Sequence, residues 1–357
     1  MQRMRTLAGI SILALVLAAC SSGASDTAAE GGMEETTAAV ADDSNCAAAE
    51  SFCVGLVTDI GKVDDKSFNQ SAHEGAMAAA AEVGGFYKYI ETTDTKDYAA
   101  NMKQFTDKSY DVIVTVGFLM AEATVAAAKE NPNTKFIGVD QFQGEEVANL
   151  TGLIFPEDQA GYAAGYLAGM LTKSNKLGQV LGLEIPPVQK FAKGFEAGAK
   201  AANANVKVTT VYHPPADNGF ADPVWGAAEA KKQLSQGADI IFGAGGGTGN
   251  GALIEIAKAE GAGTSVFCIG VDTDQWGTVP EAQPCLVTSA MKGLVEGTTD
   301  LVKAAFDGSI KGGNFLGTTG LADYHDLASA VPADVQSKVA EVVAGLKDGS
   351  IKTGVTL

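Results

Sequence analysis

CVGLVT at residues 53–58 is a β-rich run that leads directly into the polar loop DIGKVDDKSFN at residues 59–69, where a helix is expected to begin. We expect Ser67 to be the N-cap residue of that helix. A strand, a polar loop and a helix in this order form one parallel βα unit. The loop then lies at the carboxyl end of the strand, where open α/β sheets bind ligands.

The same unit repeats in two series along the chain. In the first series we expect strands at 53–58, 87–91, 111–116, 135–139 and 150–155, and helices at 67–83, 98–109, 120–131 and 157–171. In the second we expect strands at 177–183, 206–212, 239–242 and 265–271, and helices at 188–202, 224–236 and 249–259. Two such series predict an α/β fold of two similar, doubly wound parallel-sheet lobes.

After a strand at 285–288, a helix at 291–307 and a strand at 315–319 are expected to return to the first lobe. Repeated chain crossings make a hinge, and two facing sheet edges make a cleft. We therefore expect lobe 1 at 51–155 plus about 289–320, and lobe 2 at 156–288 plus about 321–357.

The N-terminus has the layout of an export signal. Arg3 and Arg5 precede an apolar run at 10–16 that closes on LAAC at 17–20. The run is too short to span a bilayer, and its end resembles a bacterial lipobox, although an ordinary signal with an incidental Cys is an alternative. Residues 21–45 carry hardly any large apolar side chain and cannot form a core. We expect a lipoprotein signal peptide at 1–19, then lipidated Cys20 and a flexible tether at 20–50, which puts the protein on the extracytoplasmic face of the cell membrane.

The charge of the chain excludes some partners. There are 25 basic and 43 acidic residues, a formal net charge of −18, and removal of the signal peptide makes it −20. A strongly acidic protein disfavours nucleic acid and polyanionic substrates. We expect a monomer that needs no cofactor.

Four cysteines remain beside Cys20, and exported proteins keep disulfides. Of three possible connectivities, Cys46–Cys53 and Cys268–Cys285 are the economical pairs. A metal site is disfavoured because no pair has CxxC spacing and the chain has only three histidines.

The expected strand ends carry polar side chains. Asp59 follows the first strand, with Phe68 and Asn69 at the start of its helix; Asp140 and Asp272 end two later strands. Single acids at such places more often cap turns, but three in one chain favour a site, because carboxylates accept the hydroxyls of a vicinal diol. We expect ligand contacts from these five residues and four others: Lys292 opening the helix at 291–307, Gly245 through its backbone, and Trp225 or Phe220 as a second stacking face.

The run VGLVTDIGKVDDKSFNQSAHEG at 54–75 resembles the signature of the basic membrane protein family of substrate-binding lipoproteins. FIGVDQ at 136–141, GYAAGYLAGMLTKS at 161–174 and GVDTDQ at 270–275 continue the resemblance over the chain after the tether. It implies a type I periplasmic-binding fold that serves an ABC importer through its permease. It also implies a nucleoside ligand, usually a purine, whose base lies between aromatic rings and whose ribose is held by Asp and Lys. Around Phe220 and Trp225 the spacing differs from the family pattern.

Other functions fit single features. GTGNGA at 247–252 matches a dinucleotide-binding fingerprint and has Asp272 at the next strand end, as in an NAD-dependent dehydrogenase, although export and the mid-chain position argue against one. A receptor for a sugar, a flavin or a signalling molecule remains an alternative. A nucleoside hydrolase would need a dense cluster of Asp for Ca²⁺, which the sequence lacks.

Overall fold

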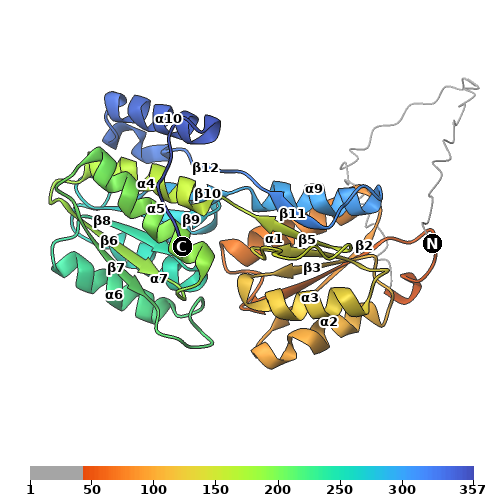
Figure 1. Ribbon diagram of the computed structural model, residues 1–357. Coiled ribbons are helices and arrows are strands. Elements are labelled where there is room, and N and C mark those ends of the chain that lie inside the picture. The colour runs from red at the N-terminus through yellow and green to blue at the C-terminus, as the bar shows by residue number, and fades with distance from the viewer. Residues whose placement is uncertain (1–42) are drawn as a thin grey trace, which may run out of the picture.

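The computed structural model describes residues 43–357. The expected signal peptide, Cys20 and the tether up to residue 42 lie outside the described residues. Within them, the chain forms two lobes side by side (Figure 1), and each lobe is a six-stranded sheet with helices on both faces. The predicted fold class is confirmed.

The sheet of lobe 1 has the strand order β11-β5-β4-β3-β1-β2, and all its pairs are parallel. Its strands are β1 (Cys53–Ile60), β2 (Phe86–Thr92), β3 (Val112–Val116), β4 (Lys135–Val139), β5 (Leu150–Ile154) and β11 (Gly313–Leu316). Its helices are α1 (Phe68–Glu82) and α9 (Leu294–Phe306) on one face, and α2 (Tyr98–Thr106) and α3 (Ala121–Glu130) on the other. Burial on both faces explains why its central strands are nearly continuous apolar runs.

The sheet of lobe 2 has the order β12-β10-β9-β8-β6-β7, with β12 antiparallel to β10. Its strands are β6 (Lys176–Leu181), β7 (Lys207–Tyr212), β8 (Ile240–Ala244), β9 (Phe267–Asp272), β10 (Leu286–Lys292) and β12 (Thr319–Leu321). Its helices are α4 (Glu157–Leu171) and α5 (Pro186–Ala202) on one face, α6 (Pro223–Ser235) and α7 (Gly246–Ile256) on the other, α8 (Gln275–Thr278) after β9, and α10 (Ala333–Asp348) on α4. Short 3₁₀ turns complete the chain: η1 (Asp43–Asn45), η2 (Thr95–Asp97), η3 (Phe118–Met120), η4 (Pro280–Ala282) and η5 (His325–Ala330).

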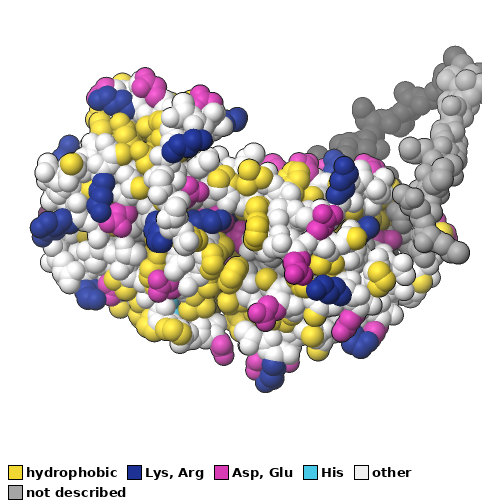
Figure 2. Space-filling model, in the orientation of Figure 1, with side chains coloured by type: hydrophobic (Ala, Val, Ile, Leu, Met, Phe, Trp, Pro, Cys, Tyr) yellow, Lys and Arg dark blue, Asp and Glu magenta, His cyan; other side chains and the backbone are white. Residues whose placement is uncertain are grey.

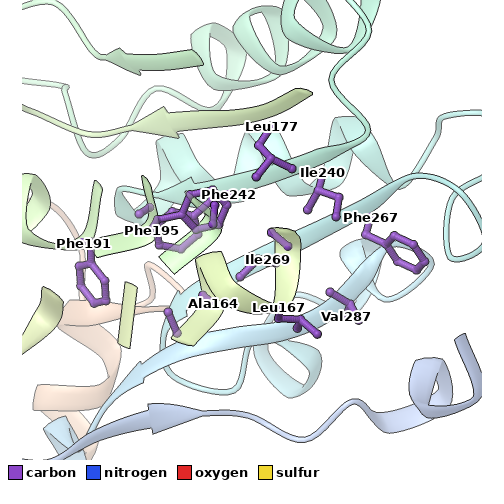
Figure 3. Packing of buried hydrophobic residues seen from close by; sticks show 14 of the residues in the cluster. Ala164, Leu167, Leu177, Phe191, Phe195, Ile240, Phe242, Phe267, Ile269 and Val287 are labelled. Atoms are coloured by element: carbon purple, nitrogen blue, oxygen red, sulfur yellow. The ribbon is translucent and has the colours of Figure 1, made fainter. Parts of the chain in front are cut away.

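The core of lobe 2 is aromatic at its centre. Phe195 of α5 stacks on Phe242 of β8 with ring centroids 5.1 Å apart, and Ile240 and Ile269 lie beside them (Figure 3). Phe191 lies at the edge of this cluster and meets Phe242 edge to face, with ring centroids 6.1 Å apart. That position leaves one of its sides available to the space between the lobes.

Helices α4 and α5 pack backbone to backbone. Gly161, Gly165 and Gly169 recur every turn on α4, and a Cβ on Gly165 would lie 1.9 Å from the carbonyl oxygen of Phe195. A Cβ on Gly198 of α5 would lie equally close to the carbonyl oxygen of Tyr162 on α4. Small residues at this interface let the two helices approach closely, and α5 begins at the interlobe cavity, which Pro187 and Val188 line.

The chain crosses between the lobes after β5, after β10 and between β11 and β12. The crossings are bonded to one another. The Gly293 N–H donates to the Thr318 carbonyl and the Gly317 N–H to the Ile154 carbonyl, each at 2.8 Å. The hinge is therefore a small hydrogen-bonded ribbon.

One expected element is wrong in detail. Lys292 does not open a helix: it is the last residue of β10, in the sheet of lobe 2, and α9 begins at Leu294. The strand thus extends beyond the crossover expected at about 289. The strand Leu286–Lys292 is buried almost throughout, as expected for a strand between β9 and β12.

Both expected disulfide pairs are present, Cys46–Cys53 and Cys268–Cys285. The first joins the N-terminal segment to β1, and Asp43 pairs there with Lys108 at 2.6 Å. Residues 43–50, part of the expected tether, are therefore attached to lobe 1. No helix within residues 43–357 is long and apolar enough to cross a membrane.

Candidate functional site

A cavity of about 350 Å³ lies between the lobes and is lined by residues of both. Small-molecule sites commonly have about 300–1,000 Å³. In the space-filling view the lobes meet at a waist where apolar side chains gather (Figure 2). The cavity lies at the carboxyl ends of β1 and β4 in lobe 1 and of β8, β9 and β10 in lobe 2. Eight of the nine residues that the sequence suggested as ligand contacts line it, all except Trp225: Asp59, Phe68, Asn69, Asp140, Phe220, Gly245, Asp272 and Lys292.

A buried lysine occupies the centre of the site. The Lys292 Nζ lies 2.5 Å from Asp140 Oδ2 and 3.4 Å from Glu157 Oε1, and all three side chains are buried. Burial alone would lower the pKa of Lys292, but Asp140, Glu157 and Asp272 together raise it above its ordinary value. The ammonium therefore stays charged and is shared between carboxylates of both lobes.

The two strand-end aspartates have the same backbone conformation. Asp140 has φ 61° and Asp272 has φ 67°, in the left-handed region that Asp tolerates better than most residues. Each carboxylate therefore turns from its strand toward the cavity. Asp272 Oδ2 accepts the Ser67 hydroxyl at 2.8 Å, which fixes it across the lobe boundary.

Two polar atoms at the cavity are buried without a protein partner. Among residues 43–357, nothing bonds to Asp140 Oδ1 or to Asn69 Oδ1. A buried polar atom without a hydrogen bond costs about 1–3 kcal/mol, so these two atoms suit a ligand that donates to them.

Two further carboxyl groups line the lobe 1 side. Burial raises the pKa of Asp59 well above its usual range, and the nearby Asp65 and Asp140 add to this. Burial also raises the pKa of Asp65 to about 6. The three backbone N–H groups that donate to its carboxylate at the start of α1 lower the pKa, but burial has the larger effect. The site is therefore rich in acidic residues near the Lys292 ammonium.

Aromatic rings surround the lysine. Its Nζ is 4.9 Å from the ring centroid of Phe68, 5.3 Å from that of Phe155 and 5.5 Å from that of Phe191. Phe191 lines the cavity together with Phe68. A flat apolar surface thus adjoins the charged cluster, which suits a ligand with a ring and several hydroxyls.

Trp225 is not a lining residue. Its ring packs edge-on against His213, with centroids 4.7 Å apart, and against the core of lobe 2. Phe220, the other sequence candidate, does line the cavity. A proline begins α6 at Pro223, and the Asp222 carboxylate accepts the Trp225 N–H, so this turn directs the indole inward.

Sequence reasoning missed Glu157 and Phe191. Glu157 opens α4 and looks like an acid in the first turn of a helix. Phe191 and Phe195 are four residues apart, the spacing of a core stripe. The pattern of the core was visible, but the exposure of one of its members to the cavity was not.

The glycines of the dinucleotide fingerprint have a packing role. A Cβ on Gly251 would lie 2.1 Å from the Pro223 carbonyl oxygen, and one on Gly226 would lie 2.0 Å from that of Thr248. Close contact between α6 and α7 accounts for Gly251 of the fingerprint and for Gly226 opposite it, and Gly249 packs against Gly243 of β8. Among the described residues, no group of three His, Cys, Asp or Glu is arranged to hold a metal ion.

Residues 52–323 match the family model described as ABC transporter substrate-binding protein PnrA-like. The chain belongs to this family. It is a substrate-binding protein of an ABC transporter and not an enzyme. The resemblance found in the sequence is confirmed, and the dehydrogenase alternative is set aside.

Relatives of this substrate-binding protein cover much of its length. The CD4+ T-cell-stimulating antigen of Listeria monocytogenes is 34% identical over 320 residues, 84% of this chain and 87% of the relative. The ABC transporter nucleoside-binding protein BmpA of Lactococcus lactis is 33% identical over 227 residues, 62% of this chain and 63% of the relative. A solved ABC transporter solute-binding protein from Aeropyrum pernix has a TM-score of 0.75 at 24% identity, covering 84% of this chain and 92% of its own, and supports the fold.

We expect Lys292→Met to lower the free energy of unfolding of the ligand-free protein by about 3–5 kcal/mol, because Asp140 loses its buried counter-ion and Glu157 keeps only the more exposed Lys190. Chemical denaturation measures this. The control is Lys258→Met, which removes an exposed lysine paired with Glu255 and should change stability by about 1 kcal/mol or less. Equal effects of the two substitutions would show that the buried cluster is not held by Lys292.

Proposed function

We propose that this chain is an extracytoplasmic lipoprotein that binds a nucleoside, most readily a purine nucleoside, between its lobes and delivers it to the permease of an ABC importer. The observation that carries the proposal is the shared Lys292 ammonium beside Phe68, with unpartnered oxygens of Asp140 and Asn69 at the same cavity. The nucleoside-binding relative of Lactococcus lactis supports the same ligand class.

The ribose is assigned to the charged side of the cavity. Asp272 and Asp140 are carboxylates held at opposite lobes, and each can accept hydroxyl groups of a vicinal diol. Lys292 lies between them as a donor. Because lobe closure excludes water, each of these polar contacts gains strength.

The base is assigned to the aromatic side. Phe68 begins α1 next to Asn69 and Asp59, so a ring stacked on it would have donors and acceptors along its edge. Phe220 supplies the second stacking face in place of Trp225. A flat heterocycle fits this arrangement better than a free sugar, which would leave the apolar face of Phe68 unused.

The charge of the site also selects against nucleotides. The Lys292 ammonium lies among the carboxyl groups of Asp140, Glu157 and Asp272, so a 5′-phosphate placed beside it would meet acidic groups. A neutral nucleoside has no such penalty.

Attachment to the membrane is assigned to the N-terminus. The chain is exported, processed before Cys20 and lipidated there, and it acts as a monomer on the extracytoplasmic face of the cell membrane. Two disulfides within the described residues support an oxidising location.

We expect Phe68→Ala to weaken nucleoside binding about 5- to 150-fold, because stacking of a base on an aromatic ring contributes roughly 1–3 kcal/mol. Isothermal titration calorimetry on refolded, ligand-free protein measures the affinity. The matched control is Trp225→Phe, which changes an aromatic outside the cavity and should leave binding intact. If both variants bind like the wild type, the base does not rest on Phe68.

Calorimetry with a ligand panel tests the ligand class itself. Adenosine, guanosine and inosine should bind more tightly than adenine, ribose or adenosine monophosphate. Asp272→Ala should weaken the binding free energy of nucleosides by about 2 kcal/mol or more, because the buried hydroxyl groups that donate to Asp272 lose their acceptor. Tightest binding of ribose, a hexose or riboflavin would replace the nucleoside by that ligand class.

Mass spectrometry of the protein from its native membrane tests the anchor. The first residue should be a diacylated Cys20, and Cys20→Ser should release unlipidated protein from the membrane. Wild-type protein that begins at another residue, or carries no lipid, would contradict the assignment.

A further inference from the structure

The loop between β1 and α1, residues 61–67, belongs to lobe 1 but is bound by lobe 2. Asn250 of α7 donates through Nδ2 to the Asp65 carbonyl oxygen at 2.8 Å. Thr278 of α8 donates through its hydroxyl to the Lys66 carbonyl oxygen at 2.7 Å, and Gln275 Nε2 reaches the same oxygen at 3.3 Å. Three side chains of lobe 2 thus bind two consecutive carbonyls of lobe 1.

The accepting loop presents these carbonyls through its backbone. Lys66 has φ 62°, a left-handed conformation that few residues other than Gly and Asn adopt without cost. The Asp65 carboxylate holds the next turn by accepting the N–H groups of Ser67, Asn69 and Gln70. Because the acceptors are main-chain atoms, the contact does not depend on the exposed Lys66 side chain.

The donors are organised within lobe 2. Gln275 is fully buried, its Oε1 accepts the Val271 N–H at 3.0 Å, and its Nε2 also donates to Asn250 Oδ1 at 2.7 Å. These bonds do not involve lobe 1, so they persist when the lobes separate. The donors are then pre-positioned for the returning loop.

The three donors are separate from the ligand cavity. Among the described residues that line the cavity, Asn250, Gln275 and Thr278 are absent, whereas Asp272 and Lys292 are present. The loop that they bind leads directly into Phe68. The contact therefore positions a ligand-binding side chain without touching the ligand.

The geometry points to Asn250, Gln275 and Thr278 as an interlobe latch that sets the fraction of closed protein and holds Phe68 in its binding position. This inference rests on one part of the proposed function, namely that the ligand binds in the cavity between the lobes. Ligand that binds the closed form has its apparent affinity reduced by the fraction of protein that is open. Weakening the latch should then weaken binding of every cavity ligand by one common factor.

Thr278→Val and Asn250→Ala in the mature chain test the latch. Loss of a neutral hydrogen bond corresponds to about a 2- to 10-fold change in an equilibrium constant. Each variant should weaken the binding of adenosine and of inosine by the same factor. The weaker binding should appear as a faster dissociation rate. The control Thr264→Val removes a hydroxyl of lobe 2 that bonds only to the Gly261 carbonyl of its own loop, and it should leave both affinities unchanged.

Small-angle X-ray scattering of ligand-free protein supplies a readout that needs no ligand. Both latch variants should shift the protein toward the more extended, open form relative to the wild type and to Thr264→Val. Unchanged affinities and an unchanged scattering profile would overturn the latch, and so would unequal factors for the two nucleosides, which would put these residues in contact with ligand. If no nucleoside binds the wild type, the proposed function fails, and the scattering comparison alone then decides the latch.

Discussion

One buried positive charge organises this protein. The Lys292 side chain is almost completely buried, so its charge is tolerated only while carboxylates of both lobes surround it. Asp140 comes from lobe 1 and Glu157 from the start of α4 in lobe 2, and Lys292 ends β10 at a chain crossing. The ion cluster therefore joins the two sheets, the hinge and the cavity at a single point. Any movement that separates the lobes must change the partners of this charge.

Much of the fold could be predicted from local sequence patterns, because parallel βα units are recognisable by short apolar runs, polar loops and Ala-rich helices. The strand-end residues Asp59, Asp140 and Asp272 could be found for the same reason: in such sheets the carboxyl ends of strands face ligands. Lys292 was predicted correctly to line the cavity, but it was placed at the start of a helix and not at the end of β10. The sequence before Lys292 contains no turn signal that would mark where the strand ends and the helix begins.

What the sequence could not show is long-range. Glu157 looks like a helix-start acid, and only the fold brings Lys190 of α5 and Lys292 of β10 to it. Phe191 has the spacing of a core residue. Whether one side of its ring also lines the cavity depends on the position of lobe 1 relative to α5. Trp225 follows a loop as a stacking residue would, but the turn at Asp222 directs it to His213. In each case the deciding partner lies on an element far away in the chain, where periodicity and spacing carry no information.

The hydrogen bonds that tie the hinge crossings together have a mechanical consequence. Three independent threads would let the lobes slide, twist and bend with similar ease. Bonds from Gly293 to Thr318 and from Gly317 to Ile154 resist sliding of one crossing past another, while the glycines leave bending easy. These bonds therefore favour bending at the hinge over sliding or twisting of the lobes. The extent of that bend then determines both how tightly a captured molecule is enclosed and the shape that the protein presents to a transporter.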